Sequence, residues 1–516
     1  MNRLRLTLVT ASLAMVVAVA AAEDGRLIDA AKQGDARTIR ALIADGVDVD
    51  ARHPDGSTAL LWAAYRSDVA TVRILLAAGA DLNHANDYGE TPLSVVCQNR
   101  DNHLVRVLLD AGADPNTAKS TGETVLMTAV RIGHLGIVEA LLARGAEVGA
   151  RETRKGQSAL AWAVAGQHLA IARALIVAGA NVNAASRSGA TALHFAVQQS
   201  NLEAVRLLLA SGADPNMTMS YRLIDDNLQS YIESFDRVTP LSLAVEICWR
   251  DAPEMAMLGT PQQRSPYASC GRNTELGKAL LQAGADPNLA DNTEISPLHR
   301  AVWARMPGLV QALVDHGAVV DARIPETARR APPGRETVAG RAVFELPIGG
   351  TPFLLAALGP NPATEIMQIL IDSGADTNIP TRDGETPLMA VAGLVETRPA
   401  TGIYSQRSRP APPEVVLQAA QLALDGGGVN GVDEAGNTAL HGAIQSGSAD
   451  LVQFLADNGA ALDVENLDGQ TPLALAMTLN RRPYPPTDET EAERPVVDLL
   501  RRLGATMSAG EAGDPR

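Results

Sequence analysis

The sequence predicts an all-α solenoid of about twelve helix-turn-helix repeats, with short β-hairpin loops and five insertions. One observation is a period, because a Thr or Ser followed by a short apolar helix recurs at nearly constant spacing, at Thr58, Thr91, Thr124, Ser158 and Thr191. The other is composition, since 46% of the 516 residues are apolar but only 3% are aromatic. A core with so few large rings must consist of thin layers of Ala, Leu and Val, which stacked short helices provide.

The N-terminal segment 1–22 has the features of a secretory signal peptide. Arg3 and Arg5 precede an apolar stretch that ends in three alanines at Ala22. The apolar run at 6–22 falls short of the roughly 20 residues that cross a bilayer, so a retained anchor is the weaker alternative. We therefore expect cleavage near Ala22 and a periplasmic or secreted protein without a membrane span.

Each repeat contains two helices with recognisable ends. The first helix follows the Thr or Ser, which caps it, and the second is rich in Val and Leu and ends at a glycine suited to a left-handed conformation. Polar residues then turn the chain toward the next unit. The first five units read GSTALLWAA, GETPLSVVC, GETVLMTAV, GQSALAWAV and GATALHFAV, from Gly56, Gly89, Gly122, Gly156 and Gly189.

This pattern resembles the ankyrin repeat family, in which G-x-TPLH-x-AA is followed by IV-x-LL and GADVN. The match covers nearly the whole mature chain, and residues 24–50, which lack the TPLH stretch, are expected to form a terminal cap. The resemblance implies that His194, His299 and His441 are structural, because the family's imidazole at this position bonds backbone between repeats. Further capping residues are Thr239, Ser296, Thr351, Thr386, Thr438 and Thr471.

We expect the chain to consist of four segments, which are distinguished by how regular their repeats are. The divisions are a signal peptide at 1–22, regular repeats at 23–216, repeats with insertions at 217–506 and a tail at 507–516. The insertions lie at about 217–236, 249–274, 324–348, 395–413 and 480–495. The first and third lengthen hairpin loops, whereas the other three lie between the two helices of one repeat.

Candidate partner-binding residues follow from the family's pattern. Seven residues after each Thr or Ser is a position that the family leaves variable and exposed to its groove. Tyr65, Arg131 and Trp303, together with the neighbouring Arg66, are the candidates there, because Tyr, Arg and Trp often dominate interfaces. Alternatively, each side chain only covers the Ala-rich surface of its neighbour. The full set is Tyr65, Gln98, Arg131, Ala165, Gln198, Glu246, Trp303, Leu358, Gly393, Gln445 and Thr478.

The insertions supply a second group of candidates. They contain five of the seven tyrosines, and residues 395–413 have three Arg against one Glu in an acidic chain. Long loops with aromatic and arginine side chains are typical of recognition surfaces. The alternative is that the loops lie over the flank of the solenoid. The candidates are Tyr221, Tyr231, Tyr267, Tyr404 and Arg407.

Cysteine placement suggests one disulfide. Cys248 and Cys270 bracket the second insertion, and in an oxidising compartment they would close a loop of about 23 residues, worth roughly 3 kcal/mol in the chain-entropy model. Cys97 falls within a first helix and is expected to be a buried free thiol.

Charge and missing motifs exclude several functions. Two of the 43 basic residues lie in the leader, so the mature chain keeps 41 of them against 59 acidic residues and would repel nucleic acid. No nucleophile elbow, phosphate loop or metal-ligand spacing occurs, so we expect no enzyme, cofactor or metal. The resemblance implies a monomeric adaptor, scaffold or inhibitor that binds a protein partner. Alternatives are an enzyme built from the insertions, an immunity-type inhibitor of a cationic toxin and a host-directed effector.

Overall fold

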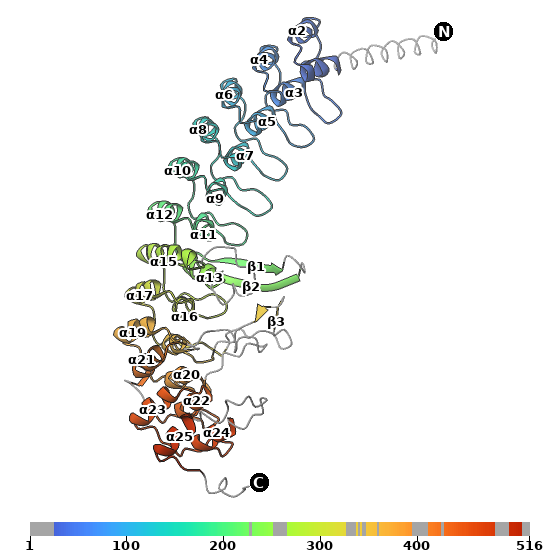
Figure 1. Cartoon of the computed structure of the whole chain (residues 1–516). Coiled ribbons are helices and arrows are strands. Elements are labelled where there is room, and N and C mark those ends of the chain that lie inside the picture. Colours follow the sequence, from blue (N-terminus) through green and yellow to red (C-terminus); the bar gives the residue numbers. More distant parts are fainter. Residues whose placement is uncertain are drawn as a thin grey trace. The chain divides into compact units, whose positions relative to one another are not determined.

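The computed structural model confirms the all-α solenoid. It describes residues 25–225, 230–250, 266–326, 337–338, 341–342, 347–358, 361–394, 411–424, 428–479 and 495–507, without the side chains of 221–235, 246–250 and 266–272. Two compact units divide the chain at Asp214 and Pro215, and each unit is a stack of helix pairs with loops on one side (Figure 1). We call them unit 1 and unit 2.

Unit 1 begins with a helical run at residues 25–33 and continues as alternating first and second helices. Each first helix packs on the first helix of the next repeat and on the second helix of its own repeat. The first helices are α3 (Ala59–Tyr65), α5 (Pro92–Gln98), α7 (Val125–Ile132), α9 (Ala159–Ala165) and α11 (Ala192–Gln198). The second helices are α2 (Ala36–Ala44), α4 (Val69–Ala77), α6 (Asn102–Asp110), α8 (Leu135–Ala143), α10 (Leu169–Val177) and α12 (Leu202–Ala210).

Local chemistry sets both ends of each repeat. In the first complete repeat the Thr58 hydroxyl accepts a 3.3 Å bond from the Leu61 N–H, which caps α3. After α4 the chain reverses at Gly79, whose φ of 89° is costly for residues with a Cβ. Between these ends Leu60 and Leu75 are fully buried, so one Leu from each helix forms the layer that the next repeat covers.

Unit 2 contains the same helix pairs and two hairpins. Strand β1 (Met219–Asp225) pairs antiparallel with β2 (Ser230–Val238) within the first insertion, and β3 (Thr337–Val338) pairs with β4 (Arg341–Ala342) within the third. The helices are α13 (Pro240–Arg250), α15 (Pro266–Gln282), α16 (Pro297–Trp303), α17 (Pro307–Asp315), α18 (Pro352–Ala357), α19 (Thr364–Asp372), α20 (Pro387–Ala392), α21 (Pro413–Leu424), α22 (Ala439–Gln445), α23 (Ala449–Asp457), α24 (Pro472–Leu479) and α25 (Pro495–Arg502).

One predicted exposed position is buried. Helix α18 ends at Ala357, and Leu358 adopts an extended conformation with φ −68° and ψ 147°. Its side chain is only 5% exposed, so the prediction that it faces outward is wrong. The reason is local, because the Gly359-Pro360 pair that follows in the sequence disfavours another helical turn.

A ladder of side-chain bonds links successive repeats at the ends of the second helices. Asn83 Oδ1 accepts a 2.8 Å bond from the backbone N–H of Asp114, and Asn116 Oδ1 accepts a 2.7 Å bond from that of Glu147. The next residue in this frame is Gly149, which has no side chain to offer, and the ladder resumes at Asn183. The interface that follows Gly149 therefore lacks one inter-repeat bond.

Replacing Gly149 by Asn is expected to stabilise unit 1 by about 1 kcal/mol. A Cβ at Gly149 would meet no atom within 4 Å, so the side chain has room. The change restricts the unfolded backbone and offers an acceptor at the empty position of the ladder. Urea unfolding followed by circular dichroism measures the gain. Gly149→Ala is the matched control, and equal gains for Ala and Asn would show that no ladder bond forms.

Candidate functional site

Near the end of each first helix of unit 1 stands an exposed residue, and these residues form a row that runs from repeat to repeat. The first helices themselves lie on the side of the loops (Figure 1). We call this row the first-helix face. All five of its members are exposed, whereas the cores of the same helices are almost fully buried. The members are Tyr65, Gln98, Arg131, Ala165 and Gln198.

An aromatic cluster centred on Trp62 lies at the start of this face and includes Tyr65. Tyr65 is 42% exposed, and its ring packs against Trp62 with ring centroids 5.5 Å apart. His53 also contacts Trp62, in an edge-on arrangement with ring centroids 6.5 Å apart, and Lys32 Nζ lies 4.8 Å from the centre of the Trp62 ring. Burial, with nearby carboxylates, raises the pKa of Tyr65, so its hydroxyl stays protonated and able to donate.

Arg66 is directed toward the terminal cap. Its Nη1 donates a 3.1 Å bond to the carbonyl of Lys32. Its guanidinium also lies close to Gly34, because a Cβ added to that glycine would come within 3.0 Å of Nη2. Arg66 therefore joins the first complete repeat to the cap, although its side chain is also exposed.

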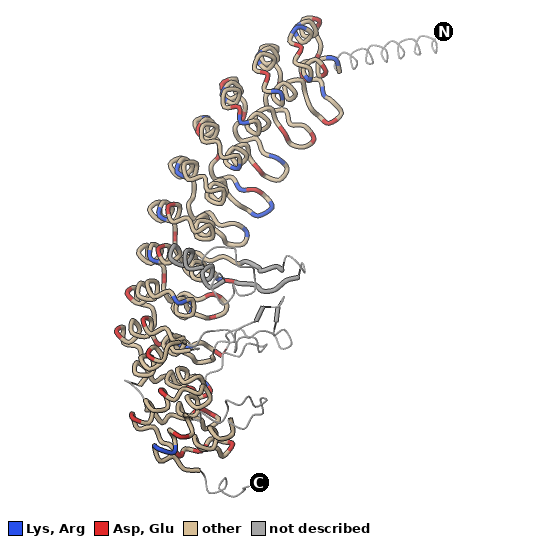
Figure 2. Tube along the Cα trace, viewed as in Figure 1, with Lys and Arg blue, Asp and Glu red and all other residues tan. Residues whose placement is uncertain are grey.

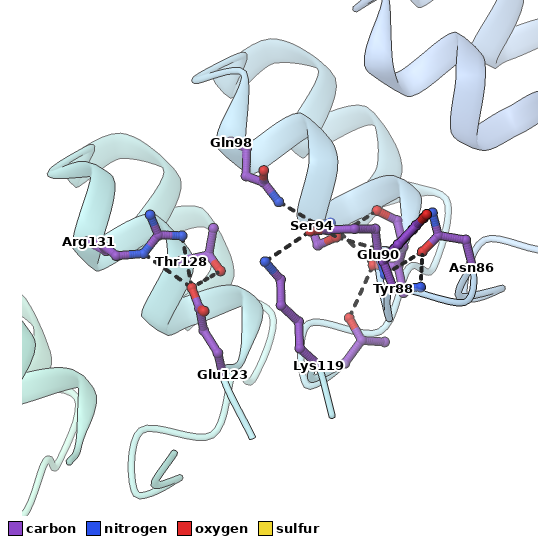
Figure 3. Close-up of polar contacts among 11 residues, drawn as sticks. Asn86, Tyr88, Glu90, Ser94, Gln98, Lys119, Glu123, Thr128 and Arg131 are labelled. Atoms are coloured by element: carbon purple, nitrogen blue, oxygen red, sulfur yellow. Dashed lines mark hydrogen bonds and ion pairs between the residues drawn. The ribbon is translucent and has the colours of Figure 1, made fainter. Parts of the chain in front are cut away.

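Gln98 is held by an acid at the start of its own helix (Figure 3). Glu90 accepts bonds of 2.6 Å from Ser94 Oγ and 2.9 Å from Gln98 Nε2, and Lys119 Nζ lies 2.9 Å from its other oxygen. Burial would raise the pKa of Glu90, but the bonds from Ser94, Lys119 and Gln98 outweigh that effect and lower it. The carboxylate therefore stays charged and fixes Gln98 and the next loop.

The following repeat holds Arg131 in the same way. Glu123 Oε1 accepts bonds of 2.9 Å from Nη2 and 3.3 Å from Nε of Arg131, and a 3.0 Å bond from the hydroxyl of Thr128 (Figure 3). The Arg131 side chain remains 52% exposed, whereas that of Glu123 is 17% exposed. Arg131 is thus oriented in advance, which lowers the entropy lost when it contacts a partner.

Sequence reasoning missed these orienting acids. Glu90 and Glu123 each stand one residue before the capping Thr, so the signal was the acidic residue of the GET triplets at 89–91 and 122–124. Trp162 has an analogous partner one residue before its cap, because its Nε1 donates a 3.0 Å bond to Gln157. Trp62 has Ser57 at that place, and its buried Nε1 has no hydrogen-bond partner.

The remaining candidates lie in unit 2. Trp303 ends α16 and is half-buried. Tyr404 and Arg407 lie outside the described residues, and the proposed disulfide stays a prediction. The side chains of five further candidates also lie outside the description, although the helix or strand of each is known, namely Tyr221 in β1, Tyr231 in β2, Cys248 in α13, and Tyr267 and Cys270 in α15.

The three TPLH histidines are buried. His194 Nδ1 lies 2.9 Å from the hydroxyl of Thr191, which caps its helix. The Nε2 atoms of His299 and His441 each lie 3.3 Å from a carbonyl of the following repeat, at Gly350 and Gln470. Burial lowers the pKa of His299 to about 4 and also lowers that of His441, which favours neutral rings.

Metal-binding side-chain clusters and membrane-spanning helices are both absent from the described residues. There, no group of three or more His, Cys, Asp or Glu side chains is placed to hold a metal ion. No described helix combines the length and the apolar character needed to span a membrane. Cys97 is buried, and burial raises the pKa of its thiol to about 12.

Comparison with known proteins identifies the repeat. The family model for ankyrin repeats, three copies long, matches residues 27–119, 78–152, 126–219 and 416–483, which together cover half of the chain. Zebrafish (Danio rerio) ZDHHC13, whose name describes a palmitoyltransferase, is 30% identical over 217 residues, which are 39% of this chain and 30% of that protein. Human Notch homolog protein 1 is 30% identical over 204 residues, 39% of this chain and 5% of that protein.

A solved structure is also similar in sequence to part of the chain. The ankyrin repeat domain of Bcl-3 shares 30% sequence identity, with a TM-score of 0.37, over 42% of this chain and 92% of that domain. The chain thus spans less than a third of the length of either curated relative, and each shared region is 39% of this chain.

Proposed function

The chain belongs to the ankyrin repeat family, and on that premise we propose that it is a non-catalytic module that binds another protein through the first-helix face of unit 1 and the adjacent loops. The observation that carries the proposal is the arrangement of Gln98 and Arg131. Each is exposed, yet each is held by a half-buried acid of its own repeat. Stacking requires only buried contacts between repeats, so oriented polar groups on the outside indicate recognition.

We further propose that the module works in the periplasm as an adaptor, scaffold or inhibitor. The Arg3-Arg5 start and the alanine-rich end of the leader support export. An enzyme assembled from the insertions would need a catalytic group, and the named activity of ZDHHC13 belongs to a protein of which only 30% is matched. The alternative function, inhibition of a cationic toxin, is supported only by the net negative charge of the chain and not by the positions of its acidic residues.

The experiment that tests the function uses the protein to capture its partner from the periplasm of its native host. The captured protein is identified by mass spectrometry, purified and titrated against variants in solution. We expect Tyr65→Ala with Arg131→Ala to weaken binding by about tenfold or more, since two exposed anchors of types common at interface centres are lost.

The matched control is Arg106→Ala with Arg206→Ala. These exposed arginines lie on α6 and α12, away from the first helices. Equal weakening by both pairs would reject the first-helix face as the binding surface. Capture of no specific protein, or turnover of a captured molecule, would reject the proposed function itself.

A further inference from the structure

The loops before α9 and α11 carry a basic patch in an otherwise acidic protein (Figure 2). Its members are the exposed side chains of Arg151, Arg154, Lys155 and Arg187, which we call the fingertip patch. Within the described residues, none of the four lies within 4.0 Å of a carboxylate as an ion pair. Four cations are therefore presented to solvent side by side on neighbouring loops.

Two acids lie within these two loops. Glu147 is exposed near the start of the loop before α9, whereas Glu152, which lies among the patch residues, is turned inward. Glu152 is 7% exposed, and its carboxylate accepts backbone bonds from Arg154 at 2.6 Å, Lys155 at 2.7 Å and Gln157 at 3.0 Å. It therefore organises the turn that displays Arg154 and Lys155. Among residues 151–155 and Arg187, one negative charge opposes four positive ones, so this patch keeps a net charge of about +3.

The turn owes its shape to one extra residue. The caps Thr124 and Ser158 stand one position farther apart in the sequence than the neighbouring pairs of caps do. The extra residue lengthens the loop before α9, the loop that carries both Arg154 and Lys155 at its tip. Stacking of the helices does not require this longer loop, because the repeats on either side stack without it.

The two loops are bonded to each other and to the loop before them. The backbone N–H of Arg187 donates to the Lys155 carbonyl at 2.8 Å, and Arg151 Nη1 donates to the Ala185 carbonyl at 2.6 Å. On the other side the Thr153 N–H donates to the Thr121 carbonyl at 2.8 Å. These bonds fix the backbone of the two loops relative to each other, so the loops lose little freedom on binding.

We propose that the fingertip patch binds an acidic segment of a polypeptide partner. The inference rests on the proposed function and names the chemistry of one part of the partner. Arginine forks bind carboxylates in paired hydrogen bonds, and Arg154 and Arg187 on adjacent loops suit acidic side chains spaced along one chain. Asp55 and Asp87 on the earlier loops, with the acidic remainder of the chain, would repel a long polyanion such as nucleic acid.

The test uses the mature full-length protein and a short fluorescent peptide of alternating glutamate and serine. Binding is measured by fluorescence anisotropy at low ionic strength. Arg154→Glu with Lys155→Glu is expected to weaken binding by about tenfold or more, because like charges then face each other. The control, Arg106→Glu with Arg206→Glu, makes the same change in net charge on α6 and α12 and is expected to weaken binding by less than about threefold.

Several outcomes would overturn the inference. Equal weakening by the two double variants would mean that only net charge matters. Tighter binding of oligothymidylate or of phosphatidylglycerol vesicles than of the acidic peptide would assign the patch to another ligand class. If the Tyr65 and Arg131 changes abolish partner binding while the patch variant binds the partner normally, the proposed function stands and the patch inference fails. Circular dichroism confirms that each variant is folded.

Discussion

Replacing Asp291 by alanine is expected to lower the free energy of unfolding of unit 2 by about 3–5 kcal/mol. The Asp291 carboxylate is fully buried, and Arg300 Nη2 lies 2.6 Å from its Oδ2 with the arginine side chain only 8% exposed. Asp291 Oδ1 also accepts a 2.8 Å bond from the backbone N–H of Thr293. Removing the carboxylate takes away the buried anion that lies 2.6 Å from the guanidinium of Arg300. Urea unfolding, with hydrogen exchange in α16, measures the loss.

An exposed ion pair provides the control for Asp291. Arg173 and Glu203 lie 3.1 Å apart but are 55% and 69% exposed, so Glu203→Ala is expected to cost less than about 1 kcal/mol. Adding Arg300→Met to Asp291→Ala is expected to restore most of the lost stability, since no buried charge is then left. Similar losses for the two single variants would contradict the role assigned to burial.

Unit 2 is also expected to lose stability as the pH falls from about 6.5 to about 4. Burial lowers the pKa of His299 to about 4 in the folded protein, whereas the unfolded ring titrates near 6.5. In that window the unfolded chain binds a proton that the folded chain does not, so stability decreases with falling pH by up to about 3 kcal/mol. His441 is shifted in the same direction and adds to the effect.

Thermal unfolding at pH 7 and at pH 5 measures this dependence. The His299→Gln variant lacks the titrating ring. From pH 7 to pH 5, the melting temperature of this variant should therefore fall less than that of the unchanged protein. Acids with lowered pKa, such as Asp55 at about 2, act mainly below this window. A pH dependence that is the same with and without His299 would contradict the assignment.

The helices could be predicted because their signals are local. Thr58 lies beside the N–H that it caps, and Gly79 is itself the residue with positive φ, so both ends of the repeat are written within a few residues. Repetition of these signals at a fixed period then predicts stacking. The prediction for Leu358 is wrong because the family's exposed position assumes that the first helix includes this residue. Helix α18 ends one residue earlier, at Ala357.

The polar site was harder to predict because it depends on burial by neighbouring repeats. Glu123 and Glu152 are both acidic residues of loops. Glu123 orients the side chain of Arg131, whereas Glu152 accepts hydrogen bonds from backbone N–H groups. The pairing of Asp291 with Arg300 likewise requires the stack to exclude water from both. The net negative charge of the whole chain also gave no indication of the basic fingertip patch.

Site-specific photocrosslinking tests most directly the claim that the first-helix face binds a protein partner. A photoreactive amino acid is placed at Gln98 or Gln198 on this face, or at Arg106 on α6, and the protein is irradiated in its native host. We predict that Gln98 and Gln198 crosslink to one and the same protein while Arg106 does not. Crosslinks from Arg106 alone, or the same products from all three positions, would contradict the account.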